Sequence, residues 1–432
     1  MNRNVLVISN NCFSSSSNNG KTFESIFTGL EKTNISQLYF TDDIQPDFNF
    51  CDKYFRIRDK DVLFNIISIK KRHGGQVHPQ MYLDFQPKLT KKSVSYENLK
   101  SVLRFIRDLL WSFNGWKTDD LKRWSIDQHL DFIFFIGGGS KFSHDVALFL
   151  SEFLKIDLIV FFTDDYILYP KKRTFFDYIQ NYRMKKCYHK TISRASLCFG
   201  IGEMMCETYS AYFGKDFYPI MNSVHIDMYK AKTSINHTIR ACYFGSLHTN
   251  RWKMIIKLAN YLEMMNFKNM EINVYSDGLP HIEVLKLFSN VGVKYNGGVY
   301  GNKLREALLD SDILLHVESD DEDSKAKTKL SFSTKIPEYL ASGRMILGFG
   351  PKDIASMKFL IDNKLGIVIS PKDNVDQTRE TLSNLISNHT YREYLGKSAY
   401  EFATRKFDNK KITMDFYAKI EAIIKKRENK NQ

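Results

Sequence analysis

The sequence predicts an α/β protein with two domains, each built on a parallel β-sheet. Short apolar runs of strand length recur along the chain, segments with helical spacing separate them, and the pattern restarts after a polar segment at 227–236. Strands that alternate with helices are typical of parallel sheets covered by helices on both faces. The 432 residues also exceed the usual limit for a single hydrophobic core, so two domains are expected.

The N-terminal domain is expected over 1–226. It opens with a β-branched strand at 4–9, a polar loop at 10–20 and a helix at 21–30. Further strands are predicted at 37–40, 53–56, 132–136, 158–163, 195–201 and 218–221, and further helices at 93–112, 121–130, 144–154, 175–192 and 204–213. In 93–112 the apolar residues recur every three or four positions, as in an amphipathic helix.

The C-terminal domain is expected over 237–409. Its predicted strands are 239–244, 271–275, 313–317 and 345–349, and its helices 252–264, 282–289, 303–309, 334–341 and 354–361. Three helices without intervening strands follow at 375–387, 390–405 and 410–426. Ligands of doubly wound sheets bind beyond the carboxyl ends of the strands, so the loops at those ends are the candidate site loops.

Composition narrows the class of protein. A net charge of +13 and a pI of about 9.2 fit polyanions, membrane surfaces or phosphorylated substrates, but no nucleic-acid-binding motif accompanies the charge. No apolar run approaches the roughly 18 residues of a spanning helix, and the N-terminus reads as a strand rather than a signal peptide. The six cysteines lack metal-site spacing, so we expect reduced thiols in a cytoplasmic protein.

The segment 330–349, LSFSTKIPEYLASGRMILGF, predicts a phosphate-binding helix start. Ser331 or Ser333 is placed to cap a helix that carries Lys335 in its first turn and Glu338 one turn further in. A helix N-terminus and a lysine suit a phosphate, and a carboxylate can accept hydrogen bonds from ribose hydroxyls. This combination suggests a nucleotide-diphosphate site. The alternative is that Lys335 and Glu338 form an ordinary solvated pair at i,i+3 spacing.

Several motifs accompany this segment in order along the second half of the chain. They are YFGSL at 243–247 followed by Arg251 and Lys253, VKYNGGV at 293–299, SDILLH at 311–316 and STKIPEYLASG at 333–343. Together they resemble the donor domain of GT-B glycosyltransferases, particularly glycosyltransferase family 4 and its capsule and O-antigen relatives. The resemblance covers roughly residues 239–425.

The resemblance implies a fold and an activity. The fold would be GT-B, with two Rossmann-like domains facing across a cleft and a C-terminal helix, 410–432, that crosses back to the N-terminal domain. The activity would be transfer of a sugar from a nucleotide-diphosphate sugar to a glycan or polyprenyl-diphosphate-linked acceptor in surface polysaccharide synthesis. Such enzymes need no obligatory metal or other cofactor. The expected location is the cytoplasm, and peripheral contact with the inner face of the membrane would suit a lipid-linked acceptor.

The resemblance also implies roles for individual residues. Glu338 would bind the ribose hydroxyls, and Arg251 and Lys335 the diphosphate, with Lys253 as a further candidate. Gly245 would let the backbone approach the donor. The remaining donor-binding candidates are Ser333 in the donor motif and, in the N-terminal loop, Asn19, Gly20 and Thr22.

The chain departs from the family pattern at two places. Leu330 stands where the family has the first glutamate of its acidic pair, so Glu318 either serves near the sugar or is a solvated loop residue. The family's histidine at a strand end of the N-terminal domain is absent. Asp164 or Asp165 there would orient or deprotonate the acceptor hydroxyl, or else act as a turn or N-cap aspartate. No clear D-x-D-type metal motif stands in the expected context.

Alternative functions and one further segment remain open at this stage. The missing glutamate also fits a catalytically silent, glycosyltransferase-like binding subunit, and a GT-B sugar-nucleotide epimerase would need no acceptor. An aromatic and basic segment would either lie on an anionic membrane or pack its aromatic rings in the core; its aromatic members are Trp111, Phe113, Trp116 and Trp124.

Overall fold

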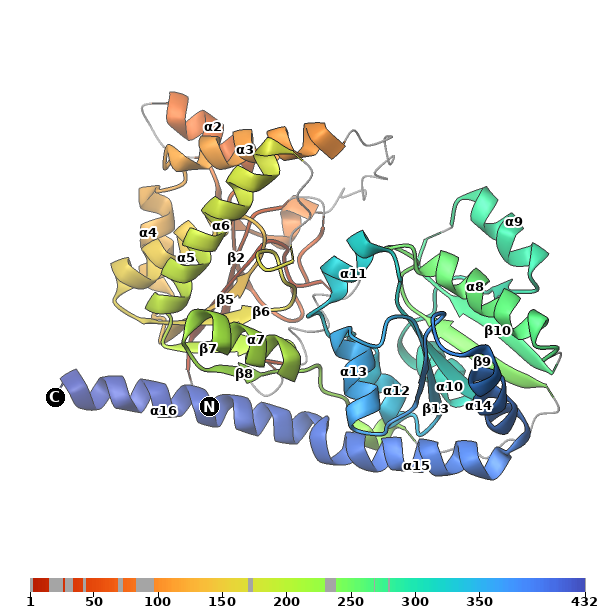
Figure 1. The fold of residues 1–432 in the computed structure, drawn as a ribbon. Coiled ribbons are helices and arrows are strands. Elements are labelled where there is room, and N and C mark those ends of the chain that lie inside the picture. The colour runs from red at the N-terminus through yellow and green to blue at the C-terminus, as the bar shows by residue number, and fades with distance from the viewer. Residues whose placement is uncertain are drawn as a thin grey trace. The chain divides into compact units, whose positions relative to one another are not determined.

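The computed structural model describes residues 3–14, 26–27, 34–41, 44–68, 73–82, 97–169, 174–229, 238–267, 269–278 and 280–431 (Figure 1). The chain divides into two compact units. The N-terminal unit comprises Met1–Ile220 together with Thr413–Gln432, and the C-terminal unit comprises Met221–Ile412. Each unit holds one sheet with helices packed on it, so the α/β prediction is confirmed.

The N-terminal unit is built on an eight-stranded sheet in the order β4-β3-β2-β1-β5-β6-β7-β8. Neighbouring strands are parallel except β3 and β4, which are antiparallel. The strands are β1 (Val5–Ser9), β2 (Ile35–Tyr39), β3 (Lys53–Arg56), β4 (Gly75–Val77), β5 (Phe132–Gly137), β6 (Asp157–Phe162), β7 (Leu197–Gly200) and β8 (Phe217–Pro219). The central strands β1 and β5 are buried along their whole length, which explains their continuous apolar sequences.

Helices cover this sheet and connect its strands. They are α2 (Asp59–Ile67), α3 (Glu97–Ser112), α4 (Asp119–Asp127), α5 (Lys141–Leu154), α6 (Phe175–Arg194) and α7 (Glu203–Phe213), with a 3₁₀ turn at Pro79–Tyr82. The last helix of the chain, α16 (Asn409–Asn431), packs on this unit from Thr413 onward. Its buried Phe416 ring lies 5.6 Å from the rings of both Phe134 and Phe199. The predicted return of the C-terminal helix is therefore present.

The C-terminal unit is built on a six-stranded, wholly parallel sheet in the order β11-β10-β9-β12-β13-β14. Its strands are β9 (Ile239–Phe244), β10 (Met270–Tyr275), β11 (Lys294–Tyr295), β12 (Ile313–Val317), β13 (Met345–Phe349) and β14 (Ile367–Ile369). Its helices are α8 (Arg251–Met264), α9 (Ile282–Asn290), α10 (Gly301–Leu309), α11 (Glu322–Thr328), α12 (Ile336–Ala341), α13 (Ala355–Asp362), α14 (Val375–Ser387) and α15 (His389–Lys406), with a 3₁₀ turn at Ile226–Met228.

The structure decides the alternatives left open for the aromatic segment. Trp111, Trp116 and Trp124 are buried in the N-terminal unit, so the core-packing alternative holds for all three. The Trp111 ring stacks on Phe142 with centroids 4.1 Å apart, and its Nε1 donates to Asp59 at 2.7 Å. Only Phe113 of this group points to solvent, at 62% exposure.

Candidate functional site

The candidate site lies at the carboxyl ends of β9 and β12, which are neighbours in the C-terminal sheet although 69 residues separate Phe244 from Ile313. The strand order turns back on itself between them, because β10 and β11 lie on one side of β9 and β12 to β14 on the other. Such a switch point opens a crevice beyond the strand ends, where doubly wound sheets bind ligands. β9 leads into Gly245 and the start of α8, and β12 leads into Glu318.

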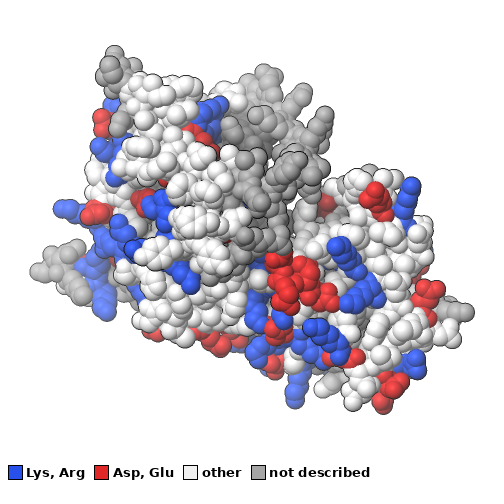
Figure 2. Space-filling view, turned by 45° about the horizontal axis from the view of Figure 1, so that its top comes forward, with Lys and Arg blue, Asp and Glu red and all other residues white. Residues whose placement is uncertain are grey.

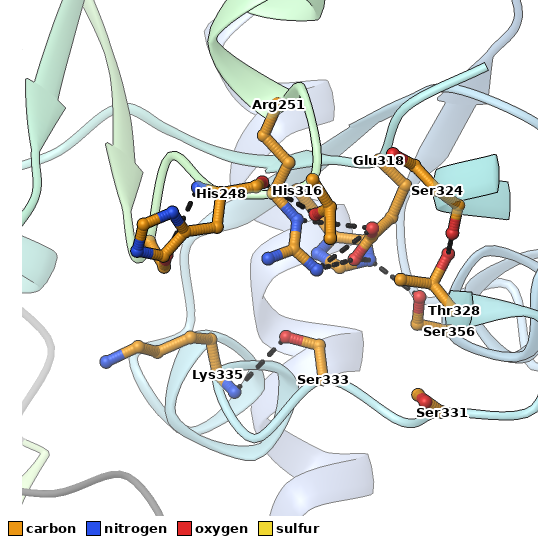
Figure 3. Close-up of polar contacts among 12 residues, drawn as sticks. His248, Arg251, His316, Glu318, Ser324, Thr328, Ser331, Ser333, Lys335 and Ser356 are labelled. Atoms are coloured by element: carbon orange, nitrogen blue, oxygen red, sulfur yellow. Dashed lines mark hydrogen bonds and ion pairs between the residues drawn. The ribbon is translucent and has the colours of Figure 1, made fainter. Parts of the chain in front are cut away.

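Arg251 and Glu318 form a bidentate ion pair across this crevice (Figure 3). Arg251 Nη2 donates to Glu318 Oε1 at 2.9 Å and to Oε2 at 3.0 Å, and Nε donates to Oε2 at 3.2 Å. The Glu318 side chain is buried, so the alternative of a solvated loop residue is excluded. The ion pair uses Nε and Nη2 of Arg251 but not Nη1. The N–H groups of Nη1 can therefore donate hydrogen bonds to a ligand.

Two further buried groups lie behind this pair. His316 Nε2 is 2.8 Å from Ser356 Oγ and 4.0 Å from Glu318 Oε1. Burial lowers the pKa of His316 to about 4, although the Glu318 carboxylate opposes the shift. His316 is therefore neutral near pH 7, and the charge of Glu318 is balanced by Arg251. Sequence reasoning gave neither residue a role: His316 ends the SDILLH motif at 311–316 without being singled out, and Ser356 belongs to none of the motifs.

Lys335 and Glu338 lie at the start of α12. The N-cap position is Lys335 itself, so the predicted serine cap is wrong. Ser333 instead accepts from the Lys335 backbone N–H through its hydroxyl at 3.4 Å and from the Ile336 N–H through its carbonyl at 3.2 Å, which forms a turn before the helix. Lys335 Nζ and Glu338 Oε2 are 4.0 Å apart, and both side chains are about one-quarter exposed. This weak pair leaves both groups available to a ligand.

Tyr339 ties α12 to the two strand ends. Its buried hydroxyl accepts from the Phe244 backbone N–H at 3.0 Å and lies 3.4 Å from the Leu315 carbonyl oxygen. Another tyrosine, Tyr229, lies close enough to Glu338 for that carboxylate to add to the rise in its pKa, which is caused mainly by burial. Tyr229 follows the 3₁₀ turn at Ile226–Met228, in a polar segment where the sequence carries no site signal.

Gly245 is required by the backbone at the end of β9. Its φ of +149° falls in a region that side chains disfavour, and its N–H donates to the Tyr275 carbonyl at 3.0 Å. The neighbouring candidate Lys253 is exposed, and its Nζ lies 5.4 Å from the centre of the Trp252 ring. The structure thus places Gly245 beside the crevice and Lys253 on the solvent side of α8.

The acidic pair after β12 has structural partners. Asp321 caps α11 by accepting from the Ser324 N–H at 3.0 Å, and Asn250 donates to it at 3.1 Å. Asp320 pairs with Lys257 at 2.7 Å. Within the described part of the chain, no group of three or more His, Cys, Asp or Glu side chains is arranged to hold a metal ion.

Asp165 organises the loop after β6 in the N-terminal unit. Its buried carboxylate accepts from the backbone N–H groups of Leu168 at 3.1 Å and Tyr169 at 2.8 Å, and from the Tyr209 hydroxyl at 2.7 Å. This geometry supports the turn-aspartate alternative for Asp165. Asp164 is half-buried and accepts from the Thr163 hydroxyl at 3.4 Å. The predicted residues Asn19, Gly20 and Thr22 lie outside the described residues.

Asp165→Asn is expected to lower the free energy of unfolding of the N-terminal unit by roughly 3 kcal/mol, because hydrogen bonds to a buried charged acceptor are worth about 1.5–3 kcal/mol each. The asparagine amide would also turn an N–H₂ group toward donors. Urea denaturation measures the effect, and Asp164→Asn is the matched control, expected to stay within about 0.5 kcal/mol of wild type. Wild-type stability for Asp165→Asn would contradict the anchoring role.

Two buried histidines predict acid destabilisation. His144 lies 3.0 Å from Thr191 Oγ1 and 3.1 Å from the Gly138 carbonyl, and burial lowers its pKa to about 4, as for His316. Between pH 6.5 and 4 the unfolded chain binds protons that the folded chain does not, so stability falls as the pH falls. The loss approaches roughly 3 kcal/mol per histidine. Urea denaturation at pH 7 and at pH 4.5 measures how much free energy of unfolding is lost on acidification. That loss should be roughly 2–3 kcal/mol smaller in His316→Gln than in the wild type, and an equal loss in both proteins would refute the prediction.

Comparison with known proteins shows similarity of fold rather than of sequence. The sequence matches no protein-family profile and no curated protein. HepE of Anabaena, solved in complex with UDP-glucose, superposes with a TM-score of 0.63 at 11% identity over 97% of this chain and 100% of that one. WaaG, a glycosyltransferase involved in lipopolysaccharide biosynthesis, superposes with a TM-score of 0.53 at 12% identity, over 93% of this chain and 95% of WaaG. TarM gives 0.51 at 15% identity, and the matched region spans 68% of this chain and 54% of TarM.

These matches cover both units and establish the class of fold. The chain has the GT-B fold of glycosyltransferases, as the motif resemblance predicts. No helix among the described residues is long and apolar enough to cross a membrane. All six cysteines are buried.

Proposed function

We propose that this protein is a glycosyltransferase that moves a sugar from a nucleotide-diphosphate sugar to a glycan or polyprenyl-diphosphate-linked acceptor in surface polysaccharide synthesis. The observation that carries the proposal is the arrangement at the ends of β9 and β12. There a guanidinium held by a buried carboxylate lies near Lys335 (Figure 3). Lys335 Nζ is 4.0 Å from a carboxylate oxygen of Glu338, and both side chains are about one-quarter exposed. Two cations and one acceptor of hydrogen bonds match a diphosphate attached to a ribose.

The proposed chemistry follows from this arrangement. Transfer breaks the bond between the anomeric carbon and the diphosphate oxygen, and the leaving diphosphate gains negative charge. Arg251, through Nη1, and Lys335 stabilise that charge, while Glu338 accepts hydrogen bonds from the ribose hydroxyls. Gly245 and Ser333 border the same crevice. No step of this scheme requires a metal or another cofactor.

Glu318 and Asp164 take supporting roles in this proposal. Glu318 positions Arg251, because a role for its carboxylate at the sugar would require the buried ion pair to open. Asp164, beside the anchored Asp165, orients or deprotonates the acceptor hydroxyl. The site would operate in the cytoplasm at the inner face of the membrane, where nucleotide sugars and lipid-linked acceptors meet.

A second candidate function is a donor-binding subunit without catalysis. Leu330, in place of the family's first glutamate, is buried in the C-terminal unit and offers no group to the sugar. Such a protein would keep Arg251, Lys335 and Glu338 as a binding site. It would bind the nucleotide sugar but transfer nothing.

Thermal-shift screening followed by turnover tests both functions. Sugars linked to UDP, GDP and dTDP should stabilise the protein by about 2.7 kcal/mol at a concentration 100 times the Kd. CMP-linked sugars, which lack a diphosphate, are the matched control and should bind more weakly. Release of the nucleoside diphosphate with an acceptor supports the transferase. Binding without release across an acceptor panel favours the silent subunit, and the absence of any shift refutes both.

A further inference from the structure

Three neighbouring helices of the N-terminal unit turn apolar side chains to solvent. α3 packs between α2 and α6: Arg107 of α3 binds Asp59 of α2 at 2.8 Å, and Gln180 of α6 donates to Asp108 of α3 at 2.8 Å. Figure 1 shows α2 and α3 side by side with α6 next to them. The exposed apolar and aromatic side chains of the three helices, which we call together the α2–α3–α6 face, are Leu63, Phe64, Ile66, Ile67, Leu103, Ile106, Leu109, Phe113, Phe175, Tyr178 and Tyr182.

In α3 the usual pattern of an amphipathic helix is reversed at part of its surface. Leu103, Ile106, Leu109 and Phe113 recur at helical spacing, and each is about half exposed or more. On the inner side the charged Asp108 is buried against Gln180. A helix selected only to complete this unit would bury the leucines and expose the aspartate. The outward stripe is therefore not explained by packing within the unit.

α2 repeats the reversal. Its buried residues are Asp61, Val62 and Asn65, whereas Leu63, Phe64, Ile66 and Ile67 are exposed. Asp61 is held by Arg58 at 2.9 Å, and the Asn65 amide donates to the His73 carbonyl at 2.8 Å. Ile67 is 73% exposed. Polar side chains are thus satisfied inside while four apolar ones face water.

α6 carries an exposed aromatic stripe of its own, on the side turned away from its contacts with α3. Phe175, Tyr178 and Tyr182 are spaced by three and four residues, and all are more than half exposed. Lys186 Nζ lies 4.7 Å from the centre of the Tyr182 ring. Tyrosine and lysine side chains, with apolar bodies and polar tips, are typical of the boundary between lipid tails and headgroups.

The charges around this face are positive. Lys60 of α2 and Arg104 of α3 are exposed, as are Lys186 and Lys190 of α6. The acidic groups described on these helices are engaged locally: Asp59 by Arg107, Asp61 by Arg58, Asp108 by Gln180 and Asp177 by Thr174. Figure 2 shows lysine and arginine side chains, with some aspartate and glutamate, scattered over the otherwise uncharged surface of the N-terminal unit. The chain as a whole carries +13.

We propose that the α2–α3–α6 face lies on an anionic lipid surface, with its aliphatic side chains in the acyl boundary and its tyrosines and lysines among the headgroups. Exposed apolar side chains that gather on neighbouring helices mark an interaction site. Basic residues beside it favour anionic lipid, because interfacial binding combines buried apolar area with attraction to negative headgroups. The proposed function, with its lipid-linked acceptor, supplies the reason for the protein to bind a membrane. The membrane binding itself is inferred from the α2–α3–α6 face and does not depend on that function.

Cosedimentation of the full chain with vesicles tests the proposal. Phosphatidylcholine vesicles are compared with phosphatidylcholine vesicles that contain phosphatidylglycerol. Wild-type protein should partition to the anionic vesicles, and more weakly at high salt. Ile106→Glu and Ile67→Glu should each lower partitioning by roughly tenfold or more. Arg104→Glu should lower it by roughly fivefold or more. Ile282→Glu, at an exposed position on α9 of the C-terminal unit, is the matched control and should bind as wild type does.

The proposal is overturned if wild-type protein binds neither vesicle, or if Ile106→Glu and Ile67→Glu bind as wild type does. A second outcome also overturns it: the wild-type protein binds no vesicles, sedimentation velocity shows that it is a dimer, and Ile106→Glu dissociates that dimer. The α2–α3–α6 face would then bind a second copy of the chain. Thermal shift with nucleotide sugars separates the two proposals. Vesicle binding without any donor shift would refute the proposed function and leave the lipid surface standing.

Discussion

Glu318→Ala is expected to destabilise the C-terminal unit by about 3–5 kcal/mol, the usual cost of removing one partner of a buried ion pair. The substitution leaves the guanidinium of Arg251 without its carboxylate, in a crevice where only about one-fifth of that side chain reaches water. Urea denaturation measures the loss. Donor affinity should fall as well, because Arg251 is no longer held at the crevice.

A double variant separates charge from packing in this prediction. Arg251→Met with Glu318→Leu replaces the pair by apolar groups, so stability should return to near the wild-type value. Donor binding should not return, because the cation is gone. If Glu318→Ala retained wild-type stability, the ion pair would not stabilise the fold, and the positioning role proposed for Glu318 would be refuted.

Glu338→Ala is expected to weaken binding of the nucleotide sugar by about 2–4 kcal/mol, or roughly 30- to 1000-fold in Kd, since a carboxylate that accepts from two ribose hydroxyls loses both bonds. Stability should change by less than about 0.5 kcal/mol, because among the described residues the ion pair given up is the weak 4.0 Å contact with Lys335. Isothermal titration calorimetry with the donor identified by thermal shift measures the affinity.

Two controls accompany this measurement. Glu380→Ala removes an exposed glutamate from α14, distant in sequence from the site, and should leave affinity unchanged. Glu338→Gln keeps one acceptor oxygen and should fall between alanine and wild type. Unchanged affinity in Glu338→Ala would remove this residue from the ribose site and with it the main support for a nucleotide-sugar donor.

The strands were the most predictable part of this fold. The predicted ranges 239–244, 313–317 and 345–349 coincide with β9, β12 and β13, because strands buried on both faces read as continuous apolar runs. α2, α11 and β14 were not predicted. In α2 the polar residues Asp61 and Asn65 are the buried ones, so its hydrophobic pattern does not point to the core. β14 has three residues, of which only Ile369 is fully buried.

The candidate site likewise contains residues that the sequence predicted and residues whose contacts only the structure shows. Lys335 and Glu338 lie three residues apart on one turn, so a local pattern revealed them. Arg251 and Glu318 are 67 residues apart in the chain, and only the adjacency of β9 and β12 brings them together. The sequence pointed to Asp165 as well but left a chemical role and a turn role open, because the N–H groups and the tyrosine that occupy its carboxylate become neighbours only in the folded loop.

By itself the sequence therefore determined the class of fold, the order of most of its elements and the placement of Lys335 and Glu338 on one helical turn, all of which depend on residues close together in the chain. Tertiary structure alone decided which charges pair, which carboxylates are already engaged, and which apolar residues face water. Those properties depend on burial and on contacts between strands and helices far apart in sequence. For this reason the exposed face of α2, α3 and α6 emerged only from the folded protein, while the tryptophans that suggested a surface proved to lie in its core.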